Sequence, residues 1–110
     1  MIDTLVYEKR RNERVALSIQ VEVSYTDIHQ QPQLERTHTL SVDEHGARIA
    51  TASFHPVGQM IHLSIPHLGR SAHCFVRWCS APANGAYEIG VEMEDQSNVW
   101  GVQERHMRCA

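Results

Sequence analysis

The feature that most constrains the fold is an alternation of apolar and polar side chains that starts at residue 15. From there to residue 25 every second side chain is apolar or aromatic, namely Val15, Leu17, Ile19, Val21, Val23 and Tyr25. A period of two places successive side chains on opposite faces of a strand. The stretch therefore predicts a strand with one buried face.

Further extended segments follow at regular intervals, at about residues 34–40, 47–51, 60–65, 72–78 and 87–93. Turn signals separate them, and the clearest is Asn84-Gly85, because Asn-Gly favours the positive φ angles of a hairpin turn. Residues 41–46 are expected to form a polar loop. In the fifth segment the alternation puts Trp78 on the same face as Cys74 and Val76. Six short strands without a helical pattern between them predict an all-β antiparallel barrel or sandwich.

The composition is that of one ordinary globular domain, with 110 residues of which 42% are hydrophobic and 21% charged. Residues 1–14 are expected to form a flexible arm, 15–94 a β-barrel, and 95–110 a tail with a short C-terminal helix. No apolar run approaches the roughly 18 residues that span a bilayer, and no signal-peptide pattern is present. A cytoplasmic location is the expectation.

Residue types that serve catalysis or metal binding are present, but not in the patterns that such sites require. His62, His67 and His73 fall at different strand phases, and the chain has no HxH or HExxH spacing. Nucleophile elbows, P-loops and paired carboxylates are absent from the sequence. A net charge of −3 with 6% aromatic residues argues against nucleic-acid binding. We expect that the protein is not an enzyme and that it has no metal site, no cofactor and no nucleic-acid partner.

The cysteines Cys74, Cys79 and Cys109 form no CxxC pair. The spacing of Cys74 and Cys79 puts them on opposite faces of one strand, so they cannot bridge each other within it. We expect reduced structural thiols.

One basic cluster interrupts this otherwise acidic chain. Lys9, Arg10, Arg11 and Arg14 supply four of the ten Lys and Arg residues within six positions. Arginine pairs bidentately with phosphate oxygens or with the O6 and N7 edge of guanine. In a turn or helix Arg10 and Arg14 would approach to about 5–6 Å between Cβ atoms, whereas full extension holds them about 13–14 Å apart. A compact anionic ligand would order this segment; the alternative is a solvated charged arm.

A second polar segment, residues 39–49, separates two expected strands and contains Ser41, Asp43, Gly46 and Arg48. Ser and Asp side chains can accept hydrogen bonds from the N–H edge of a purine, and glycine permits a tight turn or a close approach of a ligand. The alternative is a plain hairpin loop.

Together the two segments resemble the PilZ domain family. PilZ domains carry RxxxR just before the first strand and [D/N]xSxxG, often continued as G-A-x-[IL], about thirty residues later. Arg10-x-x-x-Arg14 matches the first motif, and residues 41–49 match the spacing and the ending of the second. Residues 75–78 and 84–93 resemble the fifth and sixth strands of the family with their hairpin. The resemblance covers roughly residues 8–94.

The resemblance implies a six-stranded antiparallel PilZ-type β-barrel with a short C-terminal helix, and a bacterial receptor for cyclic di-GMP. The residues expected to bind this ligand are Arg10, Arg11, Arg14, Ser41, Asp43, Gly46, Arg48 and Trp78. The arginines would bind phosphates and guanine edges, and Gly46 would let the loop close on the ligand. Trp78 would stack near a base if it faces the barrel mouth; burial in the core is the alternative.

One departure from the family pattern concerns the second motif, where this chain has SxD in place of DxS or NxS. Ser41 stands at the position of the Asp or Asn that reads guanine, and Asp43 at the position of the serine. Losing one charge-assisted hydrogen bond costs about 1.5–3 kcal/mol, on the order of ten- to a hundredfold in affinity. Either the loop shifts so that Asp43 contacts guanine, or the domain is a ligand-free adaptor for other proteins.

The predicted mechanism is an ordering of the N-terminal arm by cyclic di-GMP, which would create a surface for an unidentified downstream protein. The expected assembly is a monomer or weak dimer.

Overall fold

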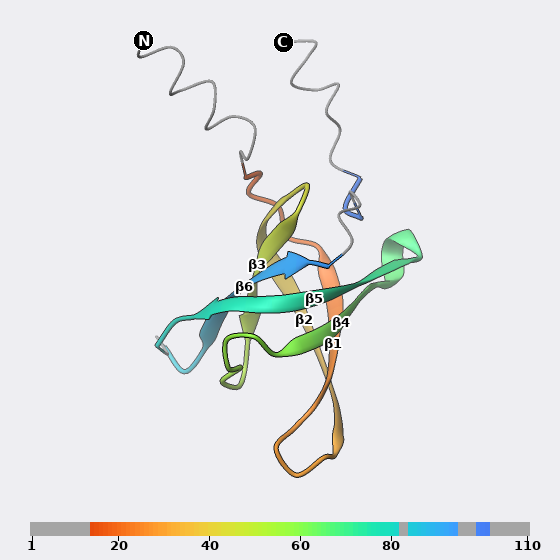
Figure 1. The fold of residues 1–110 in the computed structure, drawn as a ribbon. Coiled ribbons are helices and arrows are strands. Elements are labelled where there is room, and N and C mark those ends of the chain that lie inside the picture. Colours follow the sequence, from red (N-terminus) through yellow and green to blue (C-terminus); the bar gives the residue numbers. More distant parts are fainter. Residues whose placement is uncertain (1–13, 82–83, 95–98, 102–110) are drawn as a thin grey trace, which may run out of the picture.

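The computed structural model describes residues 14–81, 84–94 and 99–101. Its strands are β1 (Gln20–Thr26), β2 (Pro32–Asp43), β3 (Gly46–Thr51), β4 (Met60–Ile65), β5 (Arg70–Cys79) and β6 (Tyr87–Met93), with a 3₁₀ helix η1 (Pro66–Leu68) between β4 and β5. They close into an antiparallel barrel in the order β1-β2-β3-β6-β5-β4 (Figure 1). The predicted six-stranded antiparallel barrel is confirmed.

The predicted arm and the predicted C-terminal helix lie largely outside the described residues, since 1–13, 95–98 and 102–110 are not among them. Arg10, Arg11 and Cys109 therefore lie outside the described residues. Within the described part of the chain, no helix is long and apolar enough to cross a membrane.

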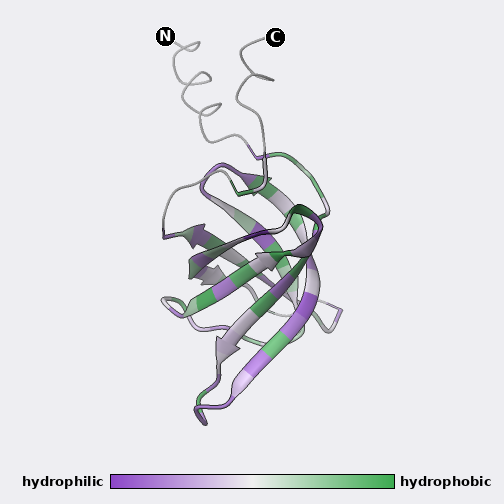
Figure 2. Cartoon of the chain, turned by 90° about the vertical axis from the view of Figure 1, so that its right-hand side faces the viewer, coloured by the Kyte–Doolittle hydropathy of each residue, from purple (hydrophilic) through white to green (hydrophobic). Residues whose placement is uncertain are grey.

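The core follows from the two-residue alternation, which is visible along the strands in Figure 2. Every strand sends apolar side chains inward, and the largest fully buried ones are Ile49, Ile61, Leu63, Ile65 and Ile89. The last described residues complete the core, because Val99 and Trp100 are also buried. Trp100 Nε1 donates to the Gly46 carbonyl at 3.1 Å. The C-terminal segment thus packs at the same end of the barrel as the β2–β3 turn (Figure 1).

The first strand is shorter than predicted, because the chain leaves the regular ladder between residues 16 and 19. Val15 forms only an isolated bridge with Val42, and β1 begins at Gln20. The Thr39 hydroxyl provides hydrogen bonds to the backbone of this irregular stretch. It donates to the Leu17 carbonyl at 2.6 Å and accepts from the Ile19 N–H at 2.9 Å. Val15 and Leu17 are consequently 39% and 40% exposed, so the prediction that they face the core was wrong.

Two further corrections concern strand ends. β2 continues through Asp43, so the predicted loop at 41–46 shrinks to the two turn residues 44 and 45. β5 carries a bulge between Val76 and Trp78. Because a bulge inserts an extra residue, the side chains after it change face.

The bulge corrects two predictions about β5. Trp78 is 37% exposed, instead of sharing the buried face of Cys74 and Val76. Cys79 packs against the core on the same side as Cys74, not opposite to it. In the described part of the chain both thiols are free.

Candidate functional site

Antiparallel pairing brings the polar motif of β2 and β3 next to β6 and β5 on the outside of the barrel. The inward side chains Val42, Ala47 and Val91 are buried in the core, so their neighbours along each strand face outward. Cross-strand partners then form two outer rows. The first is Ser41–Arg48–Gly90–Trp78, and the second is Asp43–Gly46–Glu92–Phe75.

A pocket of about 320 Å³ lies over these rows. It is lined by Arg14, Asp43, His45, Gly46, Arg77, Trp78, Gly90, Val91 and Glu92. Four of the predicted site residues are therefore brought together in one depression. Ser41 and Arg48 do not line it, but they stand in the first outer row beside it.

Arg14 reaches the pocket because the chain just after it is tied to β2. Val15 and Val42 exchange backbone hydrogen bonds of 2.7 and 2.9 Å, which places Arg14 beside Asp43. Arg14 Nε lies 3.4 Å from Asp43 Oδ2, and the arginine side chain is 44% exposed. The Asp43 side chain is only 14% exposed, so a ligand would reach this ion pair from the arginine side.

Asp43 supports the turn that joins β2 and β3. Its Oδ1 accepts from the backbone N–H groups of His45 and Gly46, each at 2.8 Å. This is the local hydrogen bonding by which Asx side chains stabilise turns, and a serine hydroxyl makes it more weakly. Asp43 therefore stabilises the turn in the way that a serine, the residue of the family motif at this position, also can. Turning its carboxylate toward guanine would break both bonds.

Two buried polar atoms in the first outer row have no hydrogen-bond partner among the described residues, Ser41 Oγ and Arg48 Nε. Ser41 is 8% exposed, and the two residues are cross-strand neighbours. Arg48 Nε has only a distant ion-pair contact, 3.8 Å from Glu88 Oε1. Buried polar atoms are nearly always satisfied, so this row offers unused donor and acceptor capacity beside the pocket.

Two glycines shape the pocket floor. A Cβ at Gly90 would overlap the indole ring of Trp78, so the absent side chain is what lets that ring lie against β6. A Cβ at Gly46 would overlap the carbonyl oxygen of Val91, so Gly46 permits the close approach of β3 to β6. Gly46 thus has a role in strand packing, in addition to the predicted one toward a ligand.

The other residues that line the pocket were not predicted, namely His45, Arg77, Gly90, Val91 and Glu92. Arg77 Nε pairs with Glu92 Oε1 at 3.1 Å on the pocket rim. Only Gly90 carried a usable signal, because a glycine inside a strand pattern often marks a close approach of another group. The positions of Arg77 and Glu92 follow from the bulge and from the pairing of β5 with β6, which the sequence does not state.

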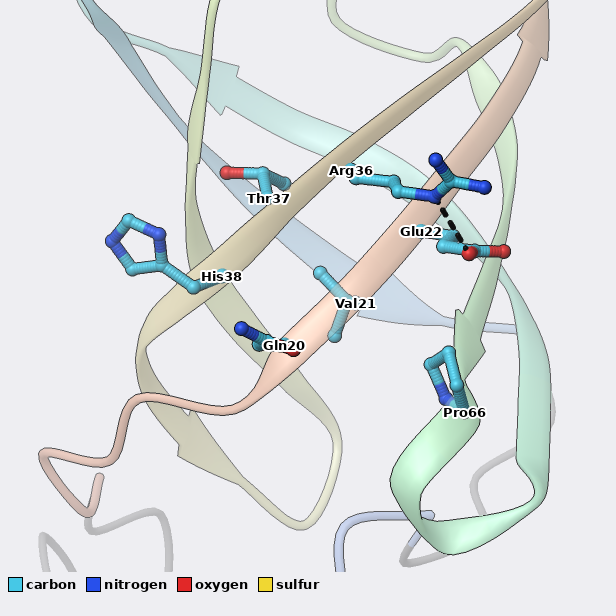
Figure 3. Close-up of a pocket in the computed structure, with 7 residues that line it drawn as sticks. All are labelled: Gln20, Val21, Glu22, Arg36, Thr37, His38 and Pro66. Atoms are coloured by element: carbon cyan, nitrogen blue, oxygen red, sulfur yellow. Dashed lines mark hydrogen bonds and ion pairs between the residues drawn. The ribbon is translucent and has the colours of Figure 1, made fainter.

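A second depression of about 320 Å³ lies on the outside of β1 and β2 and extends to Pro66 (Figure 3). Figure 3 shows the Arg36 side chain turned toward Glu22, and its Nε lies 3.1 Å from Glu22 Oε2. None of the predicted site residues that the structure describes lines this depression. We therefore take the depression at Arg14 and Trp78 as the candidate site.

The candidate site is thus a pocket on the outer face of a small barrel, with the motif residue Arg14 and the exposed Trp78 among its lining residues. The chain matches the PilZ domain family over residues 8–103 and belongs to that family. PilZ domains are cyclic di-GMP receptor and adaptor domains, not enzymes. No match was found among curated proteins.

Proposed function

We propose that the outer-face pocket binds cyclic di-GMP. The observation that carries this proposal is that Arg14, Asp43, Gly46 and Trp78, taken from separate parts of the sequence, line one pocket. Its volume of about 320 Å³ lies at the lower end of the range of about 300–1,000 Å³ usual for ligand sites. The pocket would therefore hold one part of the dinucleotide, and the segment before Arg14 would cover another.

Arg14 is the residue we assign to the phosphate or to the Hoogsteen edge of guanine. Its pairing with Asp43 runs through Nε at 3.4 Å, and a guanidinium carries further N–H donors on its two Nη atoms. A bidentate contact with phosphate or with guanine O6 and N7 uses two of these donors. Arg77 lines the same pocket, and its positive charge there is paired with Glu92, whose Oε1 lies 3.1 Å from Arg77 Nε.

Trp78 would supply the apolar surface for a base. Its ring lies against Gly90 on the outside of the barrel and remains 37% exposed. Stacking of a base on an aromatic side chain contributes about 1–3 kcal/mol per base. Trp78 is not buried in the core, because the bulge in β5 turns its side chain to the outer face.

The Ser41 hydroxyl and the Arg48 Nε–H group would form hydrogen bonds with the ligand or with ligand-bound water. A serine hydroxyl is a weaker acceptor for the N1–H and N2–H edge of guanine than a carboxylate. We therefore expect an affinity about ten- to a hundredfold below that of a site with Asp or Asn at position 41.

The ligand-free adaptor is the second candidate, and the Arg14–Asp43 ion pair favours it. The carboxylate that stands where the family motif has serine already engages the motif arginine. A site whose arginine is paired internally has less need of an anionic ligand, and the same outer face would then contact a protein.

The signalling step concerns residues 1–13, for which the sequence is the only guide. Arg10 stands four positions before Arg14, so a ligand bound at the pocket would draw both arginines to one anion and order the segment between them. Limited proteolysis tests this step: saturating cyclic di-GMP should slow cleavage within residues 1–13, and unchanged cleavage rates would count against the step.

A thermal-shift titration separates the two candidate functions. At a ligand concentration of about 100 Kd, mass action stabilises the folded state by about 2.7 kcal/mol, which raises Tm by about 10–20 °C for a domain of this size. Cyclic di-AMP and GMP serve as controls. A Tm that does not move at millimolar cyclic di-GMP would reject the receptor and leave the adaptor.

A further inference from the structure

A pair of histidines stands on the outer face of β4 and β5, and neither of them lines the candidate site. His62 and His73 are cross-strand partners, and their ring centres lie 5.0 Å apart with the ring planes inclined by 56°. Ile61 and Leu63 on either side of His62 are buried, as is Cys74 next to His73, so both imidazoles face outward. The prediction that these histidines fall at different strand phases was wrong.

The separation of the rings suits two ligands of one metal ion. Imidazole nitrogens bind first-row metals at about 2.0–2.1 Å, which puts the ion about 3.2 Å from each ring centre. Ligand–metal–ligand angles of about 90–110° then require ring centres about 4.5–5.3 Å apart. The observed 5.0 Å lies within this range, and the χ2 angle of histidine is soft enough to aim the nitrogens.

We propose that His62 and His73 bind a divalent transition-metal ion of the kind that prefers imidazole, such as Ni²⁺ or Zn²⁺. His62 is partly exposed and His73 exposed, so an ion reaches them directly from solvent. The described residues contain no group of three or more His, Cys, Asp or Glu that could hold a metal, so within this part of the chain water would fill the remaining coordination positions. A site with only two protein ligands binds its metal reversibly, as a sensor or a docking site does.

The metal alone is the probe. The full 110-residue chain is freed of metal with a chelator and titrated with NiCl₂ and with ZnCl₂ in a calorimeter, alongside His62→Ala, His73→Ala and the control His67→Ala. His67 is an exposed histidine of η1, so the control removes one imidazole without touching the pair. We expect His62→Ala and His73→Ala each to weaken metal binding at least tenfold, and His67→Ala to leave it unchanged.

Folding of the variants is checked by thermal denaturation in chelator, where all four proteins should have closely similar Tm values because the substituted side chains lie outside the core. In the wild type, added metal should also raise Tm by mass action. Three results would overturn the proposal: no binding at millimolar metal, binding that both variants of the pair retain, or binding that only one of them loses.

Discussion

The two glycines under the pocket give the sharpest test of the local geometry, because the same substitution meets a rigid obstacle at one and a movable obstacle at the other. At Gly46 a Cβ overlaps the Val91 carbonyl oxygen, which belongs to the backbone of β6. At Gly90 a Cβ overlaps the Trp78 indole, which can swing outward because the side chain is already 37% exposed.

Gly46→Ala should therefore destabilise the domain strongly. Forcing extra volume into a packed site costs about 1–3 kcal/mol, and separating β3 from β6 at this point sacrifices hydrogen bonding of about 1 kcal/mol. The sum, about 2–4 kcal/mol, is a large share of the usual 5–15 kcal/mol of a domain. It corresponds to a fall in Tm of about 10–25 °C.

Gly90→Ala should change the free energy of unfolding by less than about 1 kcal/mol, since the lost contacts of Trp78 are partly offset by the lower entropy of the unfolded chain. It should nevertheless shift the tryptophan emission, because Trp78 moves into water. Urea denaturation followed by far-UV circular dichroism measures both variants. Gly46→Ala within about 0.5 kcal/mol of wild type would refute the close approach of β3 to β6. Equal losses of unfolding free energy in the two variants would refute the inference that the Trp78 side chain can swing outward.

Three further outcomes follow from the same structure. Asp43→Ala should lower the free energy of unfolding by about 1–2 kcal/mol in urea denaturation, because two turn N–H groups lose their acceptor, and Asp43→Ser should recover part of that loss. Ser41→Asn should tighten cyclic di-GMP binding about tenfold in a calorimetric titration, and unchanged affinity would show that position 41 does not contact the base. Burial raises the pKa of the Cys74 thiol from 9.0 to about 12, so above about pH 9 the unfolded thiol ionises while the folded one stays protonated. The wild type should then lose up to about 1.4 kcal/mol of stability per pH unit relative to Cys74→Ala between pH 9 and 12, and parallel pH profiles would contradict this.

The two-residue alternation was sufficient for the strands, because it is a local property of each strand, whereas the closed barrel was expected from the family resemblance. The predicted segment at 60–65 coincides with β4. The errors arose where a tertiary partner decides the backbone. The hydroxyl of Thr39, twenty positions from Ile19, stabilises the irregular stretch before β1, and the bulge in β5 depends on its pairing with β6. Alternation alone detects neither.

The motif residues of the candidate site could be named from the sequence, but their neighbours in the pocket could not. Spacing identified Arg14, Asp43 and Gly46, since a family motif is a pattern along the chain. The register that sets Gly90 between Arg48 and Trp78 joins residues from three strands. The same limit applies to His62 and His73, which become a pair only when β4 and β5 align.

The most direct test of the central claim is a calorimetric titration of the domain with cyclic di-GMP at low and moderate salt, with Arg14→Ala and the control Arg36→Ala. Arg36 is also an exposed arginine on the outside of β2, but it pairs with Glu22 away from the pocket. The account predicts micromolar or tighter binding that salt weakens, that Arg14→Ala abolishes and that Arg36→Ala retains. No heat at millimolar ligand, or equal binding by wild type and Arg14→Ala, would contradict it.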